Sequence, residues 1–366
     1  MSNKWYIVFA CVLVGTFLFS TLLTEFIRRM ALRFGILDHP GERKVHQEPI
    51  PLMGGAAIVA TFYLMILACL LIPRSLHGFG DIWLAERFLA GLGDDAITKL
   101  AGVLAGSFLI FLLGVVDDLK ALKPEIKLVG QIAAASVLVL SGMRIELFVL
   151  SNVWLSALVT IVWVVMLTNS MNFLDNMDGL AGGVAVIAAF SFFMAVQPHE
   201  QLLVRLILII FAGAVAGFLY HNLNPARIFM GDAGAMFCGY ILATVAIMGT
   251  FHTVDTPSRI AVTAPLLALS VPLFDTASVV YIRWRRGESI MKGDKRHFSH
   301  RLVDLGMTQR QAVEFIYLVA AVTGLGAALL PQAGQGATLI ILAQTAGIFL
   351  LIVLLMNAGK RNGRVQ

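Results

Sequence analysis

Carboxylate side chains occur in pairs at two points where long apolar runs end or begin. Asp117 and Asp118 are adjacent, so both stay ionised only where cations, water or a metal ion lies nearby. Asp175 and Asp178, in "NFLDNMDGLAGG", are three residues apart and share one face if their segment is helical. A solvated helix end and a polar loop are the simpler alternatives for the two pairs.

Two further aspartates lie near or inside apolar runs. Asp232, in "FMGDAG", is either a helix cap or a third acidic group at the same site. Asp275, in "PLFDTAS", is an ionisable residue inside an apolar span, which indicates function or a polar contact between helices. An EF-hand is excluded around Asp178, because placing Gly179 at loop position six puts Ala185 where the bidentate Glu belongs.

Cationic side chains accompany these acids. Lys127 follows the first pair, and Arg296, His297 and His300 lie in a basic stretch near residues 283–310. A loop on the cytoplasmic side of a membrane explains most of the arginines, and the histidines could bind a phosphate or a metal or simply lie on the surface. Several carboxylates suit Mg²⁺, and nearby cations suit phosphates. Metal-assisted chemistry on phosphates is the reaction class that these residue types indicate.

The elements that position these residues are expected to be membrane-spanning helices. The chain has 366 residues, of which 58% are apolar and 13% charged, and its mean hydropathy is +0.85. This composition excludes an ordinary soluble domain. Because a span needs about 20 apolar residues, we predict an all-α polytopic membrane protein with about eleven spans. They are centred on 5–27, 53–73, 99–116, 128–143, 153–170, 179–197, 201–220, 233–251, 260–282, 311–330 and 336–357.

The distribution of Lys and Arg predicts the orientation. Eleven spans place 7 of the 27 basic residues on the side of the N-terminus and 20 on the other side. Basic residues favour the cytoplasm, so we expect the N-terminus outside and the C-terminus inside. Anionic headgroups or phosphorylated substrates explain these charges without a nucleic-acid partner. The three cysteines lie in apolar spans without a C-x-x-C pair, and predict neither disulfides nor a zinc site.

No linker divides the chain, so we predict one transmembrane domain over residues 1–366. Its catalytic loops are expected on the cytoplasmic face, at about 28–52, 117–127, 171–178, 221–232 and 283–310. Two other classes of protein remain open. A transporter would carry ionisable groups near the bilayer midplane, and internal repeats are common in transporters. A scaffold that recruits other enzymes through its basic loop would leave the acidic motifs without a use.

Five motifs in order resemble one family of membrane enzymes, the polyprenyl-phosphate N-acetylhexosamine-1-phosphate transferases. They are "HPGERKVHQEPIPLMGG", "GVVDDLKALKPEIK", "NSMNFLDNMDGLAGG", "HNLNPARIFMGDAGAM" and "DKRHFSHRLVDLGMTQRQAV". The chain departs from the family at Ser299, where a histidine is common, and at Ala235, where a serine is common. A triple-histidine stretch typical of the peptidoglycan branch is absent from the sequence.

The resemblance implies transfer of a sugar-1-phosphate from a UDP-sugar to undecaprenyl (polyprenyl) phosphate in the cell inner (plasma) membrane, with release of UMP. GlcNAc-1-phosphate is the expected group, and phospho-MurNAc-pentapeptide transfer is the alternative. The reaction would begin the synthesis of an envelope glycan such as lipopolysaccharide or teichoic acid. It would require Mg²⁺, with Mn²⁺ as a substitute. The sequence leaves a homodimer open.

The resemblance also implies roles for individual residues. Asp117 matches the family's proposed activator of the lipid phosphate, although a phosphate monoester is already largely ionised near neutral pH. Asp232 would be the leading metal ligand, with Asp178 as a second, and the ring of Phe229 would stack on uracil. The expected catalytic residues are Asp117, Asp118, Asp175, Asp178 and His297. The expected substrate-binding residues are Lys127, Asn172, Asn222, Phe229, Arg296 and His300.

Overall fold

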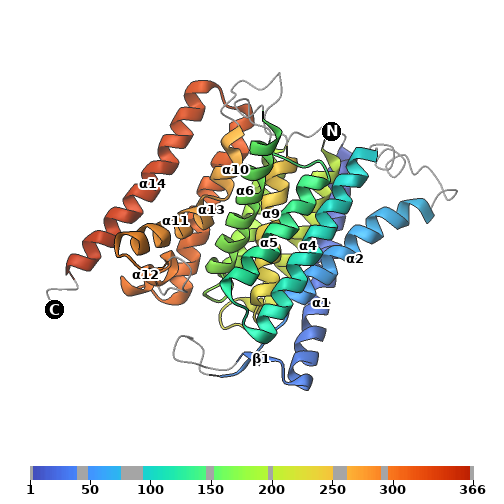
Figure 1. Cartoon of the computed structure of the whole chain (residues 1–366), viewed down its shortest axis with the longest axis horizontal. Coiled ribbons are helices and arrows are strands. Elements are labelled where there is room, and N and C mark those ends of the chain that lie inside the picture. Colours follow the sequence, from blue (N-terminus) through green and yellow to red (C-terminus); the bar gives the residue numbers. More distant parts are fainter. Residues whose placement is uncertain are drawn as a thin grey trace.

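The computed structural model describes residues 3–38, 48–75, 94–145, 152–196, 201–249, 262–289 and 296–362, and these residues are almost entirely helical (Figure 1). The elements in chain order are α1 (Asn3–Phe34), β1 (Leu37–Asp38), β2 (Ile50–Pro51), α2 (Gly54–Ser75), α4 (Asp94–Lys120), α5 (Pro124–Leu140), α6 (Val153–Leu174), α7 (Leu180–Ala195), α8 (Leu202–Asn222), α9 (Gly231–Met248), α10 (Ala264–Ala268), α11 (Ser270–Arg285), α12 (Phe298–Asp304), α13 (Gln309–Leu329), the 3₁₀ turn η2 (Leu330–Gln332) and α14 (Gln335–Asn362).

Eight of the described helices are long and apolar enough to cross a membrane, namely α1, α2, α4, α6, α8, α9, α13 and α14. The protein is therefore a polytopic helical membrane protein, as its composition predicts. Each predicted range also coincides with a helix, although α5, α7 and α11 are only 17, 16 and 16 residues long. The ninth range, 260–282, corresponds to α10 and α11, which separate at Leu269. A count of eleven crossings stays a prediction.

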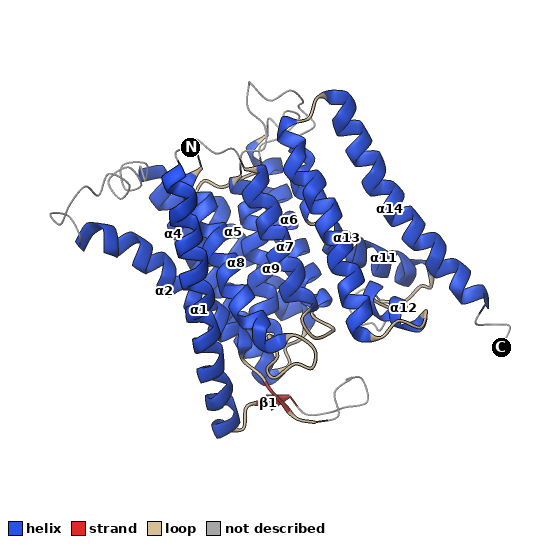
Figure 2. Ribbon diagram, turned by 180° about the vertical axis from the view of Figure 1, so that it is seen from behind, coloured by secondary structure: helices blue, strands red, loops and turns tan. Residues whose placement is uncertain are grey.

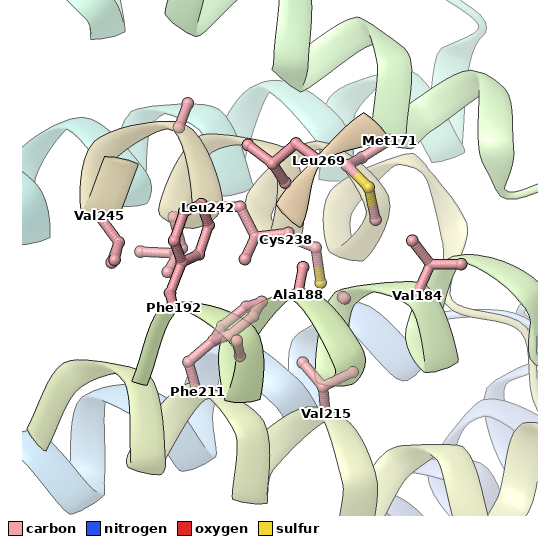
Figure 3. Packing of buried hydrophobic residues seen from close by; sticks show 14 of the residues in the cluster. Met171, Val184, Ala188, Phe192, Phe211, Val215, Cys238, Leu242, Val245 and Leu269 are labelled. Carbon is pink, nitrogen blue, oxygen red and sulfur yellow. The ribbon is translucent and has the colours of Figure 1, made fainter. Parts of the chain in front are cut away.

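Helices α8 and α9 form the centre of the bundle. In the most apolar windows of these helices, 78% and 72% of the residues are buried, against 11% in α14 at the periphery. Their apolar side chains meet those of α6 and α7, and Phe192, Phe211, Cys238 and Leu242 fill the space between (Figure 3). Because the centre is apolar on all sides, the helix ends around it are the places where polar groups can gather.

Small residues let the central helices approach closely. A Cβ atom added at Gly114 of α4 would lie 2.3 Å from the Cα atom of Ala233 in α9. At the contact of α1 with α8, the hydroxyl of Ser20 donates a 2.5 Å hydrogen bond to the carbonyl of Ala214. Such small-residue contacts are typical of helices packed within a membrane. The contact at Gly114 fixes α9 directly against α4, next to the first acidic pair.

The polar turns and the outer ends of α1 and α14 lie at the two ends of the bundle. Helix α1 begins at one end, whereas α14 ends toward the other end, on the side of α12 (Figures 1 and 2). Strands β1 and β2 pair antiparallel at that second end, with Leu37 opposite Pro51. The motif residues 39–47 and the loop residues 290–295 lie outside the described part of the chain.

Candidate active site

Four helix ends meet at the same end of the bundle and bring four polar side chains together. The Lys127 Nζ atom, in the first turn of α5, forms ion pairs with Asp117 of α4 and, at 2.8 Å, with Oδ2 of Asp232 in α9. The Asn172 side chain, near the end of α6, donates a 2.9 Å hydrogen bond to Oδ1 of Asp232. We refer to Asp117, Lys127, Asn172 and Asp232 as the acid–lysine cluster. Both carboxylates are stabilised here by one ammonium group.

Asp118 has a different position from its neighbour. Its Oδ1 atom accepts a 2.7 Å hydrogen bond from the backbone N–H of Asp232, and its Oδ2 atom accepts a 3.1 Å bond from that of Ala233. A carboxylate at this point satisfies two free N–H groups of α9 and interacts favourably with the positive end of the helix dipole. Asp118 therefore acts as a cap that comes from another helix, and it positions the backbone of Asp232.

Gly231 makes this cap possible. It adopts φ +71°, a left-handed conformation that favours glycine. A Cβ atom at this position would lie 2.6 Å from Oδ2 of Asp118. The glycine before Asp232 therefore serves both the turn into α9 and the approach of the capping carboxylate.

Asp117 has two structural roles: it stabilises the turn between α4 and α5, and it forms the ion pair with Lys127. Its Oδ1 atom accepts a 2.7 Å hydrogen bond from the backbone N–H of Leu122, and its side chain is buried. Ala121, at φ +45°, reverses the chain between the two helices. Pro124 then occupies the first turn of α5, where its missing N–H is tolerated. This short turn brings Lys127 back beside Asp117.

The loop between α6 and α7 carries the second acidic pair, and Asp175 is its most unusual member. Burial raises the pKa of Asp175 to about 8, and three neighbouring carboxylates, above all that of Asp232, add repulsion. Among the residues that the structure describes, none donates a hydrogen bond to this carboxyl group. Asp175 therefore lies close to the acid–lysine cluster without being neutralised by it.

Asp178 and Asn222 instead join this loop to residues 223–230. The Asp178 Oδ2 atom accepts 3.0 Å hydrogen bonds from the side chain of Asn224 and the backbone N–H of Ala226. The buried Asn222 accepts a 3.0 Å bond from the N–H of Gly179 and donates a 2.9 Å bond to the carbonyl of Ile228. Both ends of the Asn222 amide are thus used within the protein, which favours a positioning role over direct contact with a nucleoside.

Phe229 lies on the short segment that leads into Asp232 at the beginning of α9. Its N–H donates to the carbonyl of Pro51 at 2.8 Å, and its carbonyl accepts from Gly54 at 2.9 Å. These bonds place the beginning of α2 beside residues 229–230. Phe229 is half-buried.

The basic stretch after α11 forms a second region, which consists of Arg296, His297 and the beginning of the short helix α12. His297 directly precedes α12, and its Nδ1 atom lies 2.7 Å from Oδ2 of Asp275. Arg296 forms an ion pair with Glu288, and His300 is half-buried. The His297 ring lies 6.0 Å, between centroids, from that of Phe173, the neighbour of Asn172. This contact places the region, which we call the histidine segment (residues 296–301), next to the acid–lysine cluster.

Sequence reasoning left three supporting contacts out of the site. The hydroxyl of Ser299 donates a 2.5 Å hydrogen bond to Oδ1 of Asn176, and that of Tyr317 donates a 2.5 Å bond to the carbonyl of Gly179. One turn from Lys127 and Asn172, a pair of amides joins α5 to α6 through Gln131 and Asn169. Asn176 lies within an acidic motif and was open to inference, whereas Tyr317 lies in an apolar span without any local signal.

A metal ion would find oxygen ligands here but no complete cage. Among the described residues, no three His, Cys, Asp or Glu side chains converge as a metal-binding group. Mg²⁺ is usually held by one or two carboxylates together with substrate phosphates. The carboxylates of Asp117 and Asp232, joined by one cation, therefore fit a metal that shares its ligands with a bound phosphate.

Comparison with known proteins gives a consistent family. A model for "Glycosyl transferase family 4" matches residues 100–250, which contain the whole acid–lysine cluster. A "Probable undecaprenyl-phosphate N-acetylglucosaminyl 1-phosphate transferase" of Bacillus subtilis (strain 168) is 30% identical over 353 residues, covering 94% of this chain and 89% of that protein.

Two further relatives carry related names. A "Decaprenyl-phosphate N-acetylglucosaminephosphotransferase" of Mycolicibacterium smegmatis is 34% identical over 92% of this chain and 86% of the relative. An "Undecaprenyl-phosphate alpha-N-acetylglucosaminyl 1-phosphate transferase" of Escherichia coli (strain K12) is 27% identical over 84% of this chain and 80% of the relative. The chain belongs to glycosyl transferase family 4, the polyprenyl-phosphate N-acetylhexosamine-1-phosphate transferases, which confirms the resemblance of its motifs.

Proposed function

We propose that the protein transfers GlcNAc-1-phosphate from UDP-GlcNAc to a polyprenyl phosphate, most simply undecaprenyl phosphate. An oxygen of the lipid phosphate attacks the β-phosphorus of the donor, the bond to the α-phosphate breaks, and UMP leaves. The product is a lipid-linked GlcNAc diphosphate, the first membrane intermediate of an envelope glycan. Family membership and the names of three relatives support this reaction and this sugar.

The acid–lysine cluster is the observation that carries the proposal. Phosphoryl transfer depends mainly on positioning and on neutralising charge around the phosphorus. Lys127 supplies a cation at the meeting point of α4, α5 and α9, where it already contacts two carboxylates. When a diphosphate enters, Lys127 can contact a phosphate oxygen. Asn172 then continues to orient Asp232 through its 2.9 Å hydrogen bond.

A divalent cation, Mg²⁺ or Mn²⁺, fits the donor set at this point. Asp232 would hold it, together with phosphate oxygens and with Asp117 as the adjacent carboxylate. When bound, the ion supplies positive charge to the diphosphate. Asp178 was also predicted as a ligand, but its Oδ2 atom already holds residues 224–226. We therefore propose Asp178 as a positioning residue for the loop, next to Asp175.

The remaining residues surround the diphosphate and the nucleoside. Phe229, on the segment that leads into Asp232, would stack on uracil. Asn222 would hold that segment in place through its hydrogen bond to the carbonyl of Ile228. His297 and His300 would contact phosphate oxygens from the histidine segment. Arg296 is paired with Glu288 and could exchange that partner for a phosphate.

We place this site on the cytoplasmic face, in a single domain of residues 1–366 with about eleven helices across the membrane. Helix α1 begins and α14 ends toward opposite ends of the bundle (Figure 1), as an odd number of crossings requires. Of the 27 basic residues, 20 fall on the side of the C-terminus, which favours that side as cytoplasmic. A cytoplasmic site would meet a soluble UDP-sugar and a lipid-anchored acceptor at one surface.

A donor panel tests the proposal. Purified protein, undecaprenyl phosphate and Mg²⁺ are incubated with UDP-GlcNAc, UDP-GalNAc or UDP-MurNAc-pentapeptide, and the lipid product is identified by mass. We expect a GlcNAc diphosphate lipid with one UMP per product, lost on chelation by EDTA and restored by Mg²⁺ or Mn²⁺. A MurNAc-pentapeptide product would replace the sugar assignment. Solute flux into liposomes without any lipid product would contradict the transferase and favour a transporter.

A further inference from the structure

The strongest unassigned polar feature of the described chain is a buried carboxylate on α11. Asp275 is 0% exposed and His297 is 6% exposed. The two Asp275 oxygens have different partners, because Oδ2 lies 2.7 Å from Nδ1 of His297 and Oδ1 accepts a 2.5 Å hydrogen bond from the N–H of Phe298. One carboxylate therefore holds both the ring of His297 and the first residue of α12.

The surroundings of this pair leave the imidazole little freedom. Phe298 is fully buried, and its ring packs against Phe274, one residue before Asp275, with 5.4 Å between centroids. On the other side, the His297 ring meets Phe173 at 6.0 Å. Arg301, one turn along α12, interacts electrostatically with Asp275 and so offsets part of the buried negative charge. The ring thus lies between α11 and the end of α6.

The hydrogen bond also decides which ring nitrogen is occupied within the protein. A carboxylate accepts hydrogen bonds, so Nδ1 carries the proton and Nε2 is the nitrogen available for other contacts. Phosphate oxygens accept as well, so contact through Nε2 requires the imidazolium form. The negative charge of Asp275 compensates that form inside the protein.

We propose that Asp275 is a positioning residue that orients His297 Nε2–H toward the diphosphate of the bound UDP-sugar. The proposal rests on the proposed function, in which His297 contacts a phosphate oxygen. Asp275 has no direct contact with the substrate and acts only through His297. A carboxylate that serves merely to attach α12 would act on the fold instead, and the two roles make different kinetic predictions.

A double-mutant cycle separates these roles. Asp275→Asn, His297→Gln and the double variant are assayed for lipid-linked GlcNAc with UDP-GlcNAc and Mg²⁺. We expect each single variant to lose about 10- to 100-fold in kcat, as supporting residues of this kind commonly do. The double variant should be at most about threefold slower than His297→Gln, since coupled residues are not additive. Losses that multiply would overturn the proposal.

Ser270→Ala is the matched control on the same helix. It removes a buried 2.9 Å hydrogen bond from Ser270 to Thr323 of α13, away from the histidine segment. We expect its kcat to stay within about twofold of wild type, because the lost neutral hydrogen bond joins α11 to α13 and touches no group of the proposed site. A comparable loss of activity in Ser270→Ala would show that any buried contact of α11 matters equally, and would count against Asp275.

A spectroscopic measurement on the wild-type protein tests the Asp275–His297 hydrogen bond without relying on activity. In ¹⁵N-histidine-labelled protein, the His297 signals are assigned by their loss in His297→Gln. We expect a protonated Nδ1, and a shift of Nε2 when UDP-GlcNAc and Mg²⁺ are added. An unprotonated Nδ1, or an Nε2 that does not respond, would overturn the proposal. Wild-type protein that forms no lipid product would overturn the proposed function, while the Nδ1 signal would still decide the Asp275–His297 contact.

Discussion

The acid–lysine cluster and the histidine segment are neighbouring regions that are held in different ways. The cluster lies at the ends of four long helices, and close contacts such as Gly114 against Ala233 fix two of those helices directly. The histidine segment lies around α12, which has only seven residues. It is attached through side-chain hydrogen bonds to Asp275 and Asn176. Packing between long helices thus positions one region, whereas in the other a few polar contacts add to the packing of the buried Phe298.

This difference predicts which property of the site each kind of substitution should change. In the cluster, a change of charge should alter chemistry while the helices stay in place, because the helix contacts do not depend on it. In the histidine segment, the loss of one hydrogen bond can move the groups that would contact phosphate. Displacements of about 0.5 Å are enough to impair a catalytic arrangement. Four substitutions test this comparison, from the largest expected effect to the smallest.

The first substitution removes the charge at the centre of the cluster. Asp232→Asn keeps the size of the side chain but removes one of the two carboxylates that contact Lys127. We expect kcat to fall by about 10²- to 10³-fold, as when one electrostatic stabiliser of a transition state is lost. The rate of lipid-linked GlcNAc formation is measured together with the melting temperature, which should change little.

Asp95→Asn is the control for this change. Asp95 lies in the first turn of the same α4 helix that carries Asp117, at its other end, and its exposed carboxylate pairs with Lys99 at 2.7 Å. Exposed pairs of this kind contribute little to stability. We expect wild-type activity from Asp95→Asn. Full activity of Asp232→Asn would remove Asp232 from the proposed site while leaving the family assignment intact.

The second substitution tests whether Asp118 positions Asp232. Gly231→Ala combines an unfavourable φ of +71° with a Cβ atom 2.6 Å from the Asp118 carboxylate. Gly142→Ala meets the same kind of backbone strain at φ +85° but no atom within 4 Å. Strain alone destabilises by roughly 1–3 kcal/mol. We expect at least about a tenfold loss of activity for Gly231→Ala only, and equal activities would contradict the capping role.

The helices were predictable from the sequence because their signal is physical and continuous. Long apolar runs are needed wherever a helix crosses a bilayer, so each predicted range coincides with a helix. The break between α10 and α11 was not predicted. It falls at Leu269, beside Ser270 and between Pro265 and Pro272, in a run that is otherwise apolar. Hydropathy alone does not register such a break.

The site was predictable only in part. Acidic residues in an apolar chain mark their own positions, and Asp117, Lys127 and Asp232 do come together. The sequence does not predict that Asp117 forms the ion pair while Asp118 caps α9, because adjacent carboxylates are equivalent until their partners are known. For the same reason, no local pattern indicates that both ends of the Asn222 amide bond within the protein. Such roles depend on contacts between residues far apart in the chain.

The third substitution uses the raised pKa of Asp175, which is about 8 in the folded protein and about 3.9 in an unfolded chain. Between these values the folded protein keeps a proton that the unfolded chain releases, so stability falls as pH rises from about 4 to about 8. Asp175→Asn removes this penalty. Without Mg²⁺, we expect its melting temperature to equal that of wild type near pH 4 and to exceed it increasingly up to pH 8.5.

Asp178→Asn provides the contrast at the same loop. It weakens the two hydrogen bonds that Asp178 accepts from Asn224 and Ala226, and should lower the melting temperature. Opposite signs for the two variants at pH 8 would support a repelled Asp175 beside a bonded Asp178. A melting temperature of Asp175→Asn that follows wild type at every pH would contradict the half-buried, repelled carboxylate.

The fourth and smallest effect is expected from Ser299→Ala in the histidine segment. Ser299 is fully buried, and its 2.5 Å hydrogen bond to Asn176 joins α12 to the loop that carries Asp175 and Asp178. Its loss removes about 0.5–1 kcal/mol, which corresponds to about a twofold to fivefold lower activity if it acts through position. Ser136→Ala, which removes only a bond to its own helix at Ile132, should be silent. If Ser299→Ala is equally silent, the hydrogen bond to Asn176 does not position the histidine segment, and the contrast with the acid–lysine cluster then depends on the contacts of Asp275.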